Sequence, residues 1–389
     1  MIEHVDFDQI VNREDTLSLK YDARQTLFGR ADVTPMWVAD MDFAVPAAVT
    51  DALTERAKHP IFGYTTYPES LYAALISWFK RQHGWAIQRE WIMLCPGVVP
   101  TLHAAVMAFT APAESVIVQP PVYFPFFSSV TNTGRTLINN PLSIQHNRYV
   151  IDFDHLEQCA KDARMLLLCS PHNPVGRVWQ LNELKMLLKI AKKHDLLIFS
   201  DEIHADLVYP KHRHHVLATV ATSTDNIITA VAPSKTFNIP GLGLSALIVS
   251  NANHRKRMQE AFESMHVNAA NPFSIAAFEA AYHHGDAWLQ ALLAYLTKTR
   301  DFVIEYLALH LPQIKVIAPE ATYLLWLDCR ALQLTDRALK TMFVEKAHLG
   351  LSPGTLFGAG GSGFMRMNIA APKKVVGDAL NNIKIALSC

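Results

Sequence analysis

From about Trp91 to Ser250 the chain alternates short apolar runs rich in β-forming residues with stretches of helical periodicity. The predicted strands in this region are Ser115–Gln119, Arg164–Ser170, Leu196–Asp201, Asn226–Ala232 and Leu244–Ser250. Between the second and third of them, LNELKMLLKIAKKHD has apolar residues at helical spacing and basic residues in its last turn, where they complement the helix dipole. Such an alternation predicts an α/β fold with a mainly parallel sheet flanked by helices.

The pattern changes after Asn271. A long helical tract runs to about His310, and the short predicted strands KVIAP, TYLLWLD and FMRMNIA then bracket a further helical stretch. This is typical of a smaller α+β domain. The N-terminal residues are too few to form a core alone. We therefore expect a large domain at residues 46–285 and a small domain built from residues 1–45 and 286–389.

The overall composition narrows the functional classes. The formal net charge is zero and no Lys/Arg run follows the chain, so nucleic acid is not an expected partner. No apolar run reaches the roughly 18 to 20 residues that cross a bilayer. The N-terminus lacks the pattern of a secretory signal, and the five cysteines show no CxxC spacing. We expect no metal site, no membrane contact, and a reducing cytoplasm.

Two predicted strands lead to residues that could perform chemistry. Asp201 closes one apolar run, and Lys235 follows another within AVAPSKTFNIPGLG. Open α/β sheets bind ligands at the carboxyl ends of their strands. An acid and an amine at two such ends are also compatible with a structural ion pair, so their functional reading depends on further residues.

Two other segments supply such residues. SPHNPVG holds Asn173 between two prolines after a third strand. CPGVVPTLHAAV places Gly97 before a helix that we expect to begin near Pro100. Proline suits the first turn of a helix, and the free N–H groups of that turn attract phosphate.

In this order, the four segments resemble the aspartate-aminotransferase-like family of pyridoxal-phosphate enzymes, fold type I, over nearly the whole chain. PMWVADMDF, FGYTTYP, PPVYFPF, SPHNPVGRVW, SDEIHADL and APSKTFNIPGL look most like its cystathionine β-lyase, or cysteine-sulfur lyase, branch. The resemblance implies pyridoxal 5'-phosphate as cofactor, a small amino acid as substrate, and a homodimer whose active sites are shared across the interface.

The resemblance also assigns the central roles. Lys235 would carry the cofactor as a Schiff base and then take the substrate Cα proton. Asp201 would keep the pyridine nitrogen protonated, so that the ring accepts electrons. Asn173 would hydrogen-bond the phenolic oxygen of the ring. The alternatives are a surface lysine, a capping aspartate and an Asx-turn asparagine.

The remaining cofactor contacts follow in the same way. Tyr123 would stack on the ring, while its neighbours Phe124, Phe126 and Phe127 are candidates for plain core. The phosphate would be held by the backbone N–H groups of Val98 and Val99 and by the Ser234 hydroxyl. Tyr64 matches the tyrosine that reaches the phosphate from the neighbouring subunit; the alternative is a turn tyrosine packed locally.

The substrate end involves a second set of residues. Arg366 would grip the substrate α-carboxylate, because a guanidinium binds a carboxylate through two parallel hydrogen bonds; the alternative is a strand-edge arginine facing water. Trp37 and Ala39 would cover the same end, and Asn173 would contact the substrate as well as the cofactor.

Two departures from typical aminotransferases suggest the reaction. His204 stands beside the cofactor where those enzymes carry a tyrosine, and Gly243 stands where they carry an arginine. Both agree with β-elimination from cystathionine or a related thioether to a thiol, pyruvate and ammonia. The alternatives are an aminotransferase of the same fold and a regulatory protein that retains the pocket.

Two other patterns are discounted. GAGGSG precedes a strand and not a helix, so it does not fit a dinucleotide-binding loop. KHRHH has no carboxylate or cysteine partners at helical spacing, so we interpret it as a solvated loop.

Overall fold

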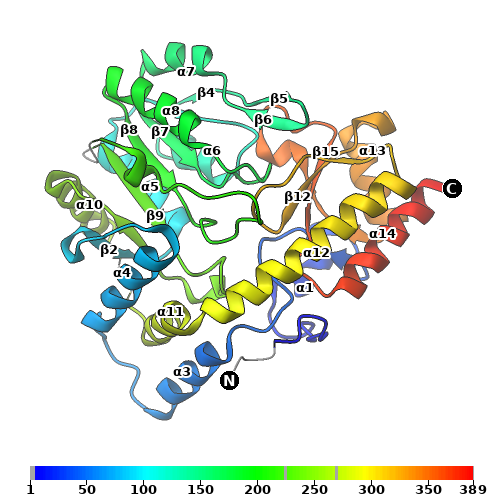
Figure 1. Cartoon of the computed structure of the whole chain (residues 1–389), viewed down its shortest axis with the longest axis horizontal. Helices are drawn as coiled ribbons and strands as arrows, with labels where there is room; N and C mark the ends of the chain where they lie inside the picture. The colour runs from blue at the N-terminus through cyan, green and yellow to red at the C-terminus, as the bar shows by residue number, and fades with distance from the viewer. Residues whose placement is uncertain (1–4, 223–225, 268–269, 389) are drawn as a thin grey trace.

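The computed structural model describes residues 5–222, 226–267 and 270–388. Its centre is a seven-stranded sheet in the order β2-β10-β9-β8-β7-β3-β4 (Figure 1). Four of the six pairings are parallel, and β10 runs antiparallel to both of its neighbours. The predicted mainly parallel sheet is thereby confirmed. Its strands are β2 (Ile92–Cys95), β3 (Ser115–Val118), β4 (Thr136–Asn139), β7 (Ala163–Cys169), β8 (Leu197–Asp201), β9 (Ile227–Val231) and β10 (Ser245–Ile248).

The central strands are continuous apolar runs because both faces of the sheet are covered. Leu166 and Ile198 belong to one buried hydrophobic cluster, whereas Leu167 and Phe199, one position further along, belong to another. Helices α5 and α10 pack together over the second cluster, and α7 and α8 pack together over the first. These helices are α5 (Val98–Phe109), α7 (Phe153–Ala160), α8 (Leu181–Lys193) and α10 (Ala252–Ser264).

Helix α8 is the one that the apolar periodicity predicts. A capping box stabilises its N-terminus: the Gln180 side chain accepts the backbone N–H of Glu183, and the Glu183 side chain accepts the backbone N–H of Gln180. The shorter elements of this part of the chain are α6 (Pro125–Thr131), α9 (Leu217–Val220) and the hairpin of β5 (Ser143–Gln145) and β6 (Arg148–Val150).

The second layer of the molecule is a four-stranded antiparallel sheet in the order β11-β12-β15-β14. Its strands are β11 (Lys315–Val316), β12 (Leu324–Asp328), β14 (Ser352–Pro353) and β15 (Phe364–Asn368). The helical stretch between them consists of α13 (Asp336–Thr341) and a π-helical turn (Met342–Lys346). The predicted strands and helix of the smaller domain are therefore present.

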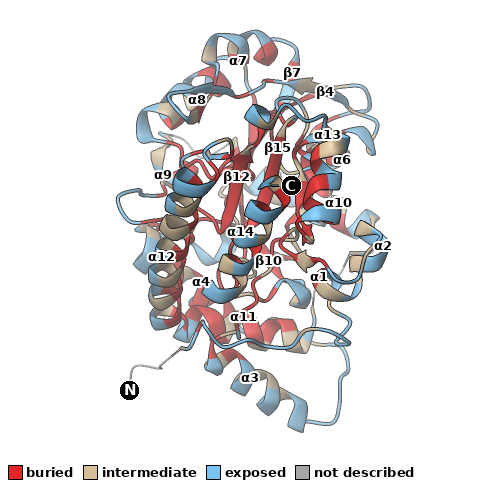
Figure 2. Cartoon of the chain, turned by 90° about the vertical axis from the view of Figure 1, so that its right-hand side faces the viewer, coloured by how far each residue is buried: buried red, intermediate tan, exposed pale blue. Residues whose placement is uncertain are grey.

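Of the long helices after residue 270, the last two border this sheet. The predicted tract is split into α11 (Pro272–His284) and α12 (Asp286–His310), and the last helix is α14 (Lys373–Ser388). The break falls at Gly285, where a Cβ would lie 2.2 Å from the Phe237 ring. Helix α12 lies beside α14, and Figure 2 shows their outer sides exposed over buried strands.

The N-terminal part of the chain joins the second layer. Strand β1 (Thr34–Pro35) pairs in parallel with β13 (Leu349–Gly350). Helices α1 (Leu19–Asp22) and α2 (Arg24–Phe28) precede β1, whereas α3 (Ala47–Lys58) and α4 (Glu69–His83) follow it and pack against α11. The domain boundaries at residues 46 and 285 stay a prediction. Within the described ranges, no helix combines the length and the apolar character needed to span a bilayer.

Candidate active site

One cavity of about 440 Å³ lies where β2, β7, β8 and β9 end and β10 begins. Segments from the second layer, around residues 352–357 and 366, line its other side. Every predicted site residue except Tyr64 lines it: Trp37, Ala39, Val98, Val99, Tyr123, Asn173, Asp201, His204, Ser234, Lys235 and Arg366. Residues from seven separate segments of the sequence thus meet in one place.

Lys235 follows β9 and points its amine at the backbone of the N-terminal segment. Its Nζ donates to the Ala39 oxygen at 2.6 Å. Burial lowers the pKa of this amine to about 8, with Asp40 and Asp201 opposing that effect and Arg366 adding to it. A substantial fraction of the amine is therefore neutral near pH 7.5 and able to accept a proton.

Asp201 is the last residue of β8, and its side chain is buried. One carboxylate oxygen accepts the Ile203 backbone N–H at 3.2 Å. Burial is the main reason that the pKa of this carboxyl is raised to about 7; the neighbouring Glu202 contributes to the rise, and the Ile203 N–H and Lys235 oppose it. A buried carboxylate without a cation in contact is costly, so this position favours a ligand that presents a protonated nitrogen.

Asn173 and Arg366 are bonded to each other inside the cavity. Arg366 Nη1 donates to Asn173 Oδ1 at 3.0 Å, and Nη2 donates to the Trp37 oxygen at 2.7 Å. Arg366 Nε is buried and has no partner within the described residues. Burial lowers the pKa of this guanidinium to about 10. Since β15 lies between β12 and β14 and Arg366 is buried, Arg366 is not a strand-edge residue facing water.

The start of α5 faces the cavity. Val98 and Val99 are its first two residues, whose N–H groups have no intrahelical acceptor. Gly97 precedes them at φ 136°, a conformation that favours glycine. The helix begins two residues before the expected Pro100, because a proline within the first turn removes only an N–H that needs no helical partner. With the Ser234 hydroxyl, this donor set suits a phosphate.

The aromatic residues after β3 divide between site and core. Tyr123 lines the cavity, and its backbone N–H donates a hydrogen bond to the backbone oxygen of Asn173 at 3.1 Å. Phe126 is fully buried and Phe127 packs against the core, as predicted. The prediction of plain core is wrong for Phe124, which is 47% exposed and lines the cavity. It immediately precedes α6, and the centroid of its ring lies 4.9 Å from the centroid of the Tyr123 ring.

His204 and one histidine of the KHRHH segment, His214, are buried. Burial lowers the pKa of His204 to about 3, so its imidazole is neutral, and its Nδ1 has no partner in the described part of the chain. The solvated-loop interpretation is wrong for His214. This histidine is buried, and its Nε2 lies 2.7 Å from a carboxylate oxygen of Glu202, the residue after Asp201.

Tyr64 lies outside the cavity, in the loop before α4. Its side chain is fully exposed, so it is not packed locally. Ile61 and Phe62 in the same loop are also mostly exposed.

Sequence reasoning missed several residues of the site. Ser352, Leu356 and Phe357 line the cavity, and Cys169 lies at the end of β7 opposite Asp201. Tyr323 hydrogen-bonds the same Ala39 oxygen as Lys235. These residues carry no local motif, so only the fold brings them together. Among residues 5–222, 226–267 and 270–388, no group of three or more His, Cys, Asp or Glu side chains could hold a metal ion.

Known proteins resemble this chain over its whole length. A model of the aminotransferase class I and II family matches residues 31–383. Cystathionine β-lyase PatB from Bacillus subtilis is 41% identical, with 99% of this chain and 100% of that protein covered. The structure of a PLP-bound putative aminotransferase from Clostridium difficile 630 has a TM-score of 0.97 at 40% identity, covering 99% of this chain and 100% of that one. The structure of a PLP-bound C–S lyase from Staphylococcus hominis has a TM-score of 0.92 at 32% identity, covering 99% and 98%.

Proposed function

The chain belongs to the aminotransferase class I and II family, and we propose that it is a pyridoxal-phosphate-dependent carbon–sulfur β-lyase. It cleaves L-cystathionine or a related cysteine thioether to a thiol, pyruvate and ammonia. The observation that carries this function is one cavity in which Lys235, Asp201, Asn173 and Arg366 converge from separate segments.

The cavity fits pyridoxal 5'-phosphate. Asp201, with its raised pKa, would hold the ring nitrogen, and Asn173 the phenolic oxygen. Tyr123 would pack on the ring, Lys235 would bind the aldehyde carbon, and the start of α5 with Ser234 would hold the phosphate. When bound, this cofactor supplies a sink for the electron pair left at the substrate Cα. His204 would lie beside it as a neutral side chain.

The substrate is oriented by the residues around Arg366. Its guanidinium is held by Asn173 and by the Trp37 oxygen, and it remains free to bind an α-carboxylate through Nε. Trp37 and Ala39 would cover this end of the site. The Lys235 amine, whose pKa burial lowers to about 8, accepts the Cα proton. Apolar side chains of the lining exclude water from the reacting carbon.

The lyase reaction is favoured over transamination by the relatives and by two positions of the cavity. His204 and Gly243 line it where typical aminotransferases carry a tyrosine and an arginine. The second candidate, an aminotransferase, is favoured by the name of the Clostridium difficile structure.

A homodimer in the cytoplasm completes the proposal. Tyr64, Ile61 and Phe62 expose apolar surface on one loop, which a second copy of the chain would cover. In that dimer Tyr64 would reach the phosphate site of the other subunit. Cys95, Cys159, Cys169 and Cys329 are free thiols, in agreement with a reducing compartment.

The test is an assay of the purified protein with L-cystathionine and cofactor but without any 2-oxo acid. Pyruvate and a free thiol in equal amounts support the lyase. Turnover that requires an added 2-oxo acid and yields no thiol contradicts it and supports the aminotransferase. The Lys235→Ala variant serves as the blank for cofactor-catalysed background.

A further inference from the structure

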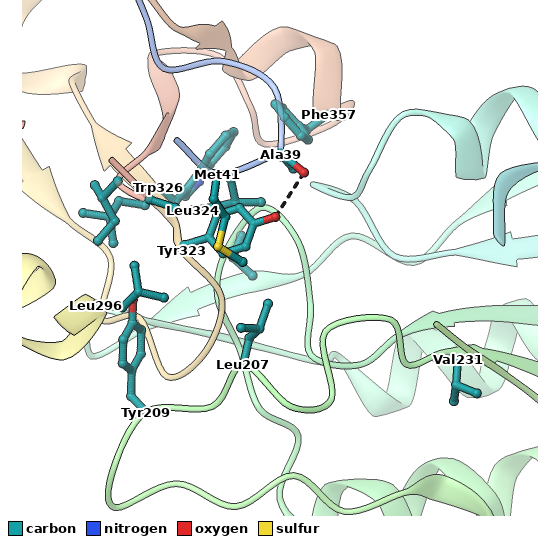
Figure 3. Packing of buried hydrophobic residues seen from close by; sticks show 14 of the residues in the cluster. Ala39, Met41, Leu207, Tyr209, Val231, Leu296, Tyr323, Leu324, Trp326 and Phe357 are labelled. Carbon is teal, nitrogen blue, oxygen red and sulfur yellow. Dashed lines mark hydrogen bonds between the residues drawn. The ribbon is translucent and has the colours of Figure 1, made fainter. Parts of the chain in front are cut away.

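Tyr323 shares a hydrogen-bond acceptor with Lys235. Its hydroxyl donates to the Ala39 backbone oxygen at 3.0 Å, and Lys235 Nζ donates to the same oxygen at 2.6 Å. Figure 3 shows the Tyr323 ring among buried hydrophobic residues, with its hydroxyl directed at Ala39. The residue is 1% exposed, so this bond forms away from solvent, where a hydroxyl needs a protein partner.

Ala39 lies in a segment, residues 37–41, that has no regular secondary structure. The other backbone oxygens of this segment accept hydrogen bonds from side chains to which the proposed reaction assigns no proton transfer. These donors are Arg366 and Ser352 to residue 37, Asn368 to residue 38, Asn368 and Lys20 to residue 40, and Arg13 and Asn238 to residue 41. The Ala39 oxygen differs, because one of its two donors is the lysine that reacts. Tyr323 is the donor that does not depend on the state of Lys235.

The backbone before Tyr323 is strained. Thr322 is β-branched and has φ 68°, in the left-handed region that such residues avoid. Two backbone hydrogen bonds stabilise this conformation: the Thr322 N–H donates to the Leu207 oxygen at 2.7 Å, and the Ala321 N–H donates to the Gly176 oxygen at 3.0 Å. Backbone strain of this kind clusters at functional sites. Here it precedes the residue that bonds Ala39.

We propose that Tyr323 is a positioning residue for the Lys235 amine, acting through the Ala39 carbonyl; this inference rests on the proposed lyase function. Lys235 becomes an ammonium when it takes the Cα proton, and the Ala39 oxygen then receives a hydrogen bond from a charged donor. A fixed acceptor favours the charged form over the neutral amine. The other ionisable groups around the amine are Asp40, Asp201, Arg366 and His204. All four are unchanged when Tyr323 loses only its hydroxyl.

The experiment compares Tyr323→Phe with a matched control, Tyr209→Phe. Tyr209 is equally buried, and its hydroxyl has no partner in the part of the chain that the structure describes. In the holoenzyme, Tyr323→Phe is expected to lower kcat roughly tenfold and to leave KM within about twofold. The limb of the kcat–pH profile that reports Lys235 should move to lower pH.

A second readout does not depend on turnover. Acetylation of Lys235 in the cofactor-free full chain is followed by mass spectrometry as a function of pH, and its midpoint should fall by roughly half a pH unit in Tyr323→Phe. Tyr209→Phe should match the wild type in every measurement. Wild-type kcat, pH profile and acetylation midpoint in Tyr323→Phe would overturn the proposal, as would equal losses of activity and melting temperature in both variants. Wild-type protein that forms no pyruvate would instead contradict the lyase function, while the acetylation midpoint would still test Tyr323.

Discussion

Arg366 donates a hydrogen bond from Nη1 to the amide oxygen of Asn173 at 3.0 Å, across a separation of 193 residues. Asn173 belongs to the loop after β7, and Arg366 belongs to β15 of the second sheet. The bond therefore joins the two layers of the molecule inside the cavity. It aims the guanidinium at the place where the substrate carboxylate is expected and orients the Asn173 amide at the same time.

Arg366→Lys tests this relationship. Lysine keeps the charge but loses the planar fork, so it cannot bind a carboxylate and Asn173 together. We expect KM for L-cystathionine to rise roughly 30- to 100-fold, while kcat changes less, because charge-assisted bonds of about 2–3 kcal/mol are lost. Steady-state kinetics measures both constants. Arg330→Lys, an exposed position of the same sheet region, is the control, and an unchanged KM in Arg366→Lys would contradict the assignment.

Lys235→Ala removes the proposed base. Turnover should fall by roughly 10³-fold or more, because no other amine lines the cavity in the described residues. The fold should persist, because the Lys235 side chain makes one hydrogen bond, to the Ala39 oxygen, and its removal breaks no ion pair among the described residues. Pyruvate formation and far-ultraviolet circular dichroism measure the two effects. The exposed Lys189→Ala is the control, and full activity in Lys235→Ala would end the mechanism.

The sequence predicts most of the site because its signals are local. Asp201 ends an apolar strand, and Lys235 and Asn173 follow two others close to prolines or glycines, so strand position identifies all three and turn chemistry supports the last two. Tyr323 could not be found in this way. Its partner Ala39 lies 284 residues earlier, and a tyrosine at the start of an apolar strand is indistinguishable from core.

The same limit explains why helix α3 is not predicted from the sequence and why the interpretation of His214 is wrong. Strands buried on both faces give continuous apolar runs, which the sequence displays. Helix α3 has one buried residue, Val49, and therefore no apolar stripe to recognise. His214 appears within a run of basic residues, yet the turn after β8 brings it to the buried carboxylate of Glu202. Burial that depends on a distant element is invisible to periodicity.

Asp201→Asn tests how the carboxyl contributes to stability. The pKa of Asp201 rises from an ordinary 3.8 to about 7 on folding. The unfolded chain loses this proton near pH 3.8 and the folded chain keeps it until about pH 7, so the penalty on folding grows through that window and is constant above it. At about 1.4 kcal/mol for each pH unit, the penalty is at most about 4 kcal/mol.

Without cofactor, Asp201→Asn should therefore be more stable than the wild type at pH 8, and the difference should shrink towards pH 5. Urea unfolding at both pH values measures it. The exposed Asp162→Asn should show no such pH dependence. With cofactor present, the order should reverse at pH 8, because the variant loses the acid that holds the ring nitrogen. A stability difference independent of pH would contradict the burial argument.

Glu320 is expected to be important for stability and not for chemistry. It is buried and pairs with Arg177, which is fully buried, and with Arg148 at 2.9 Å. Glu320→Ala leaves Arg177 with Glu183 as its remaining carboxylate partner. Because Arg177 keeps this counter-charge, we expect the loss of the hydrogen bonds to Glu320 to cost about 1–3 kcal/mol. Chemical denaturation measures the loss. Glu345→Ala, which removes an exposed partner of Arg30, should change stability little, and an equal effect of both variants would contradict the prediction.

Tyr64 provides the test of a shared active site. Its side chain is fully exposed and outside the cavity of its own chain, so in a monomer Tyr64→Ala should have no effect on turnover. In the proposed dimer, each site needs Lys235 from one subunit and Tyr64 from the other. A hybrid of a Tyr64→Ala subunit and a Lys235→Ala subunit then contains one site with both defects and one intact site.

Unfolding and refolding an equal mixture of the two inactive variants should therefore restore roughly a quarter of wild-type activity, because half of the dimers are hybrids and each hybrid has one intact site of two. Each variant refolded alone should remain inactive, which is the control for recovery during refolding. Size-exclusion chromatography checks that dimers form in all samples. A mixture with no more activity than its components, in the presence of dimers, would show that Tyr64 does not complete the site of the partner subunit.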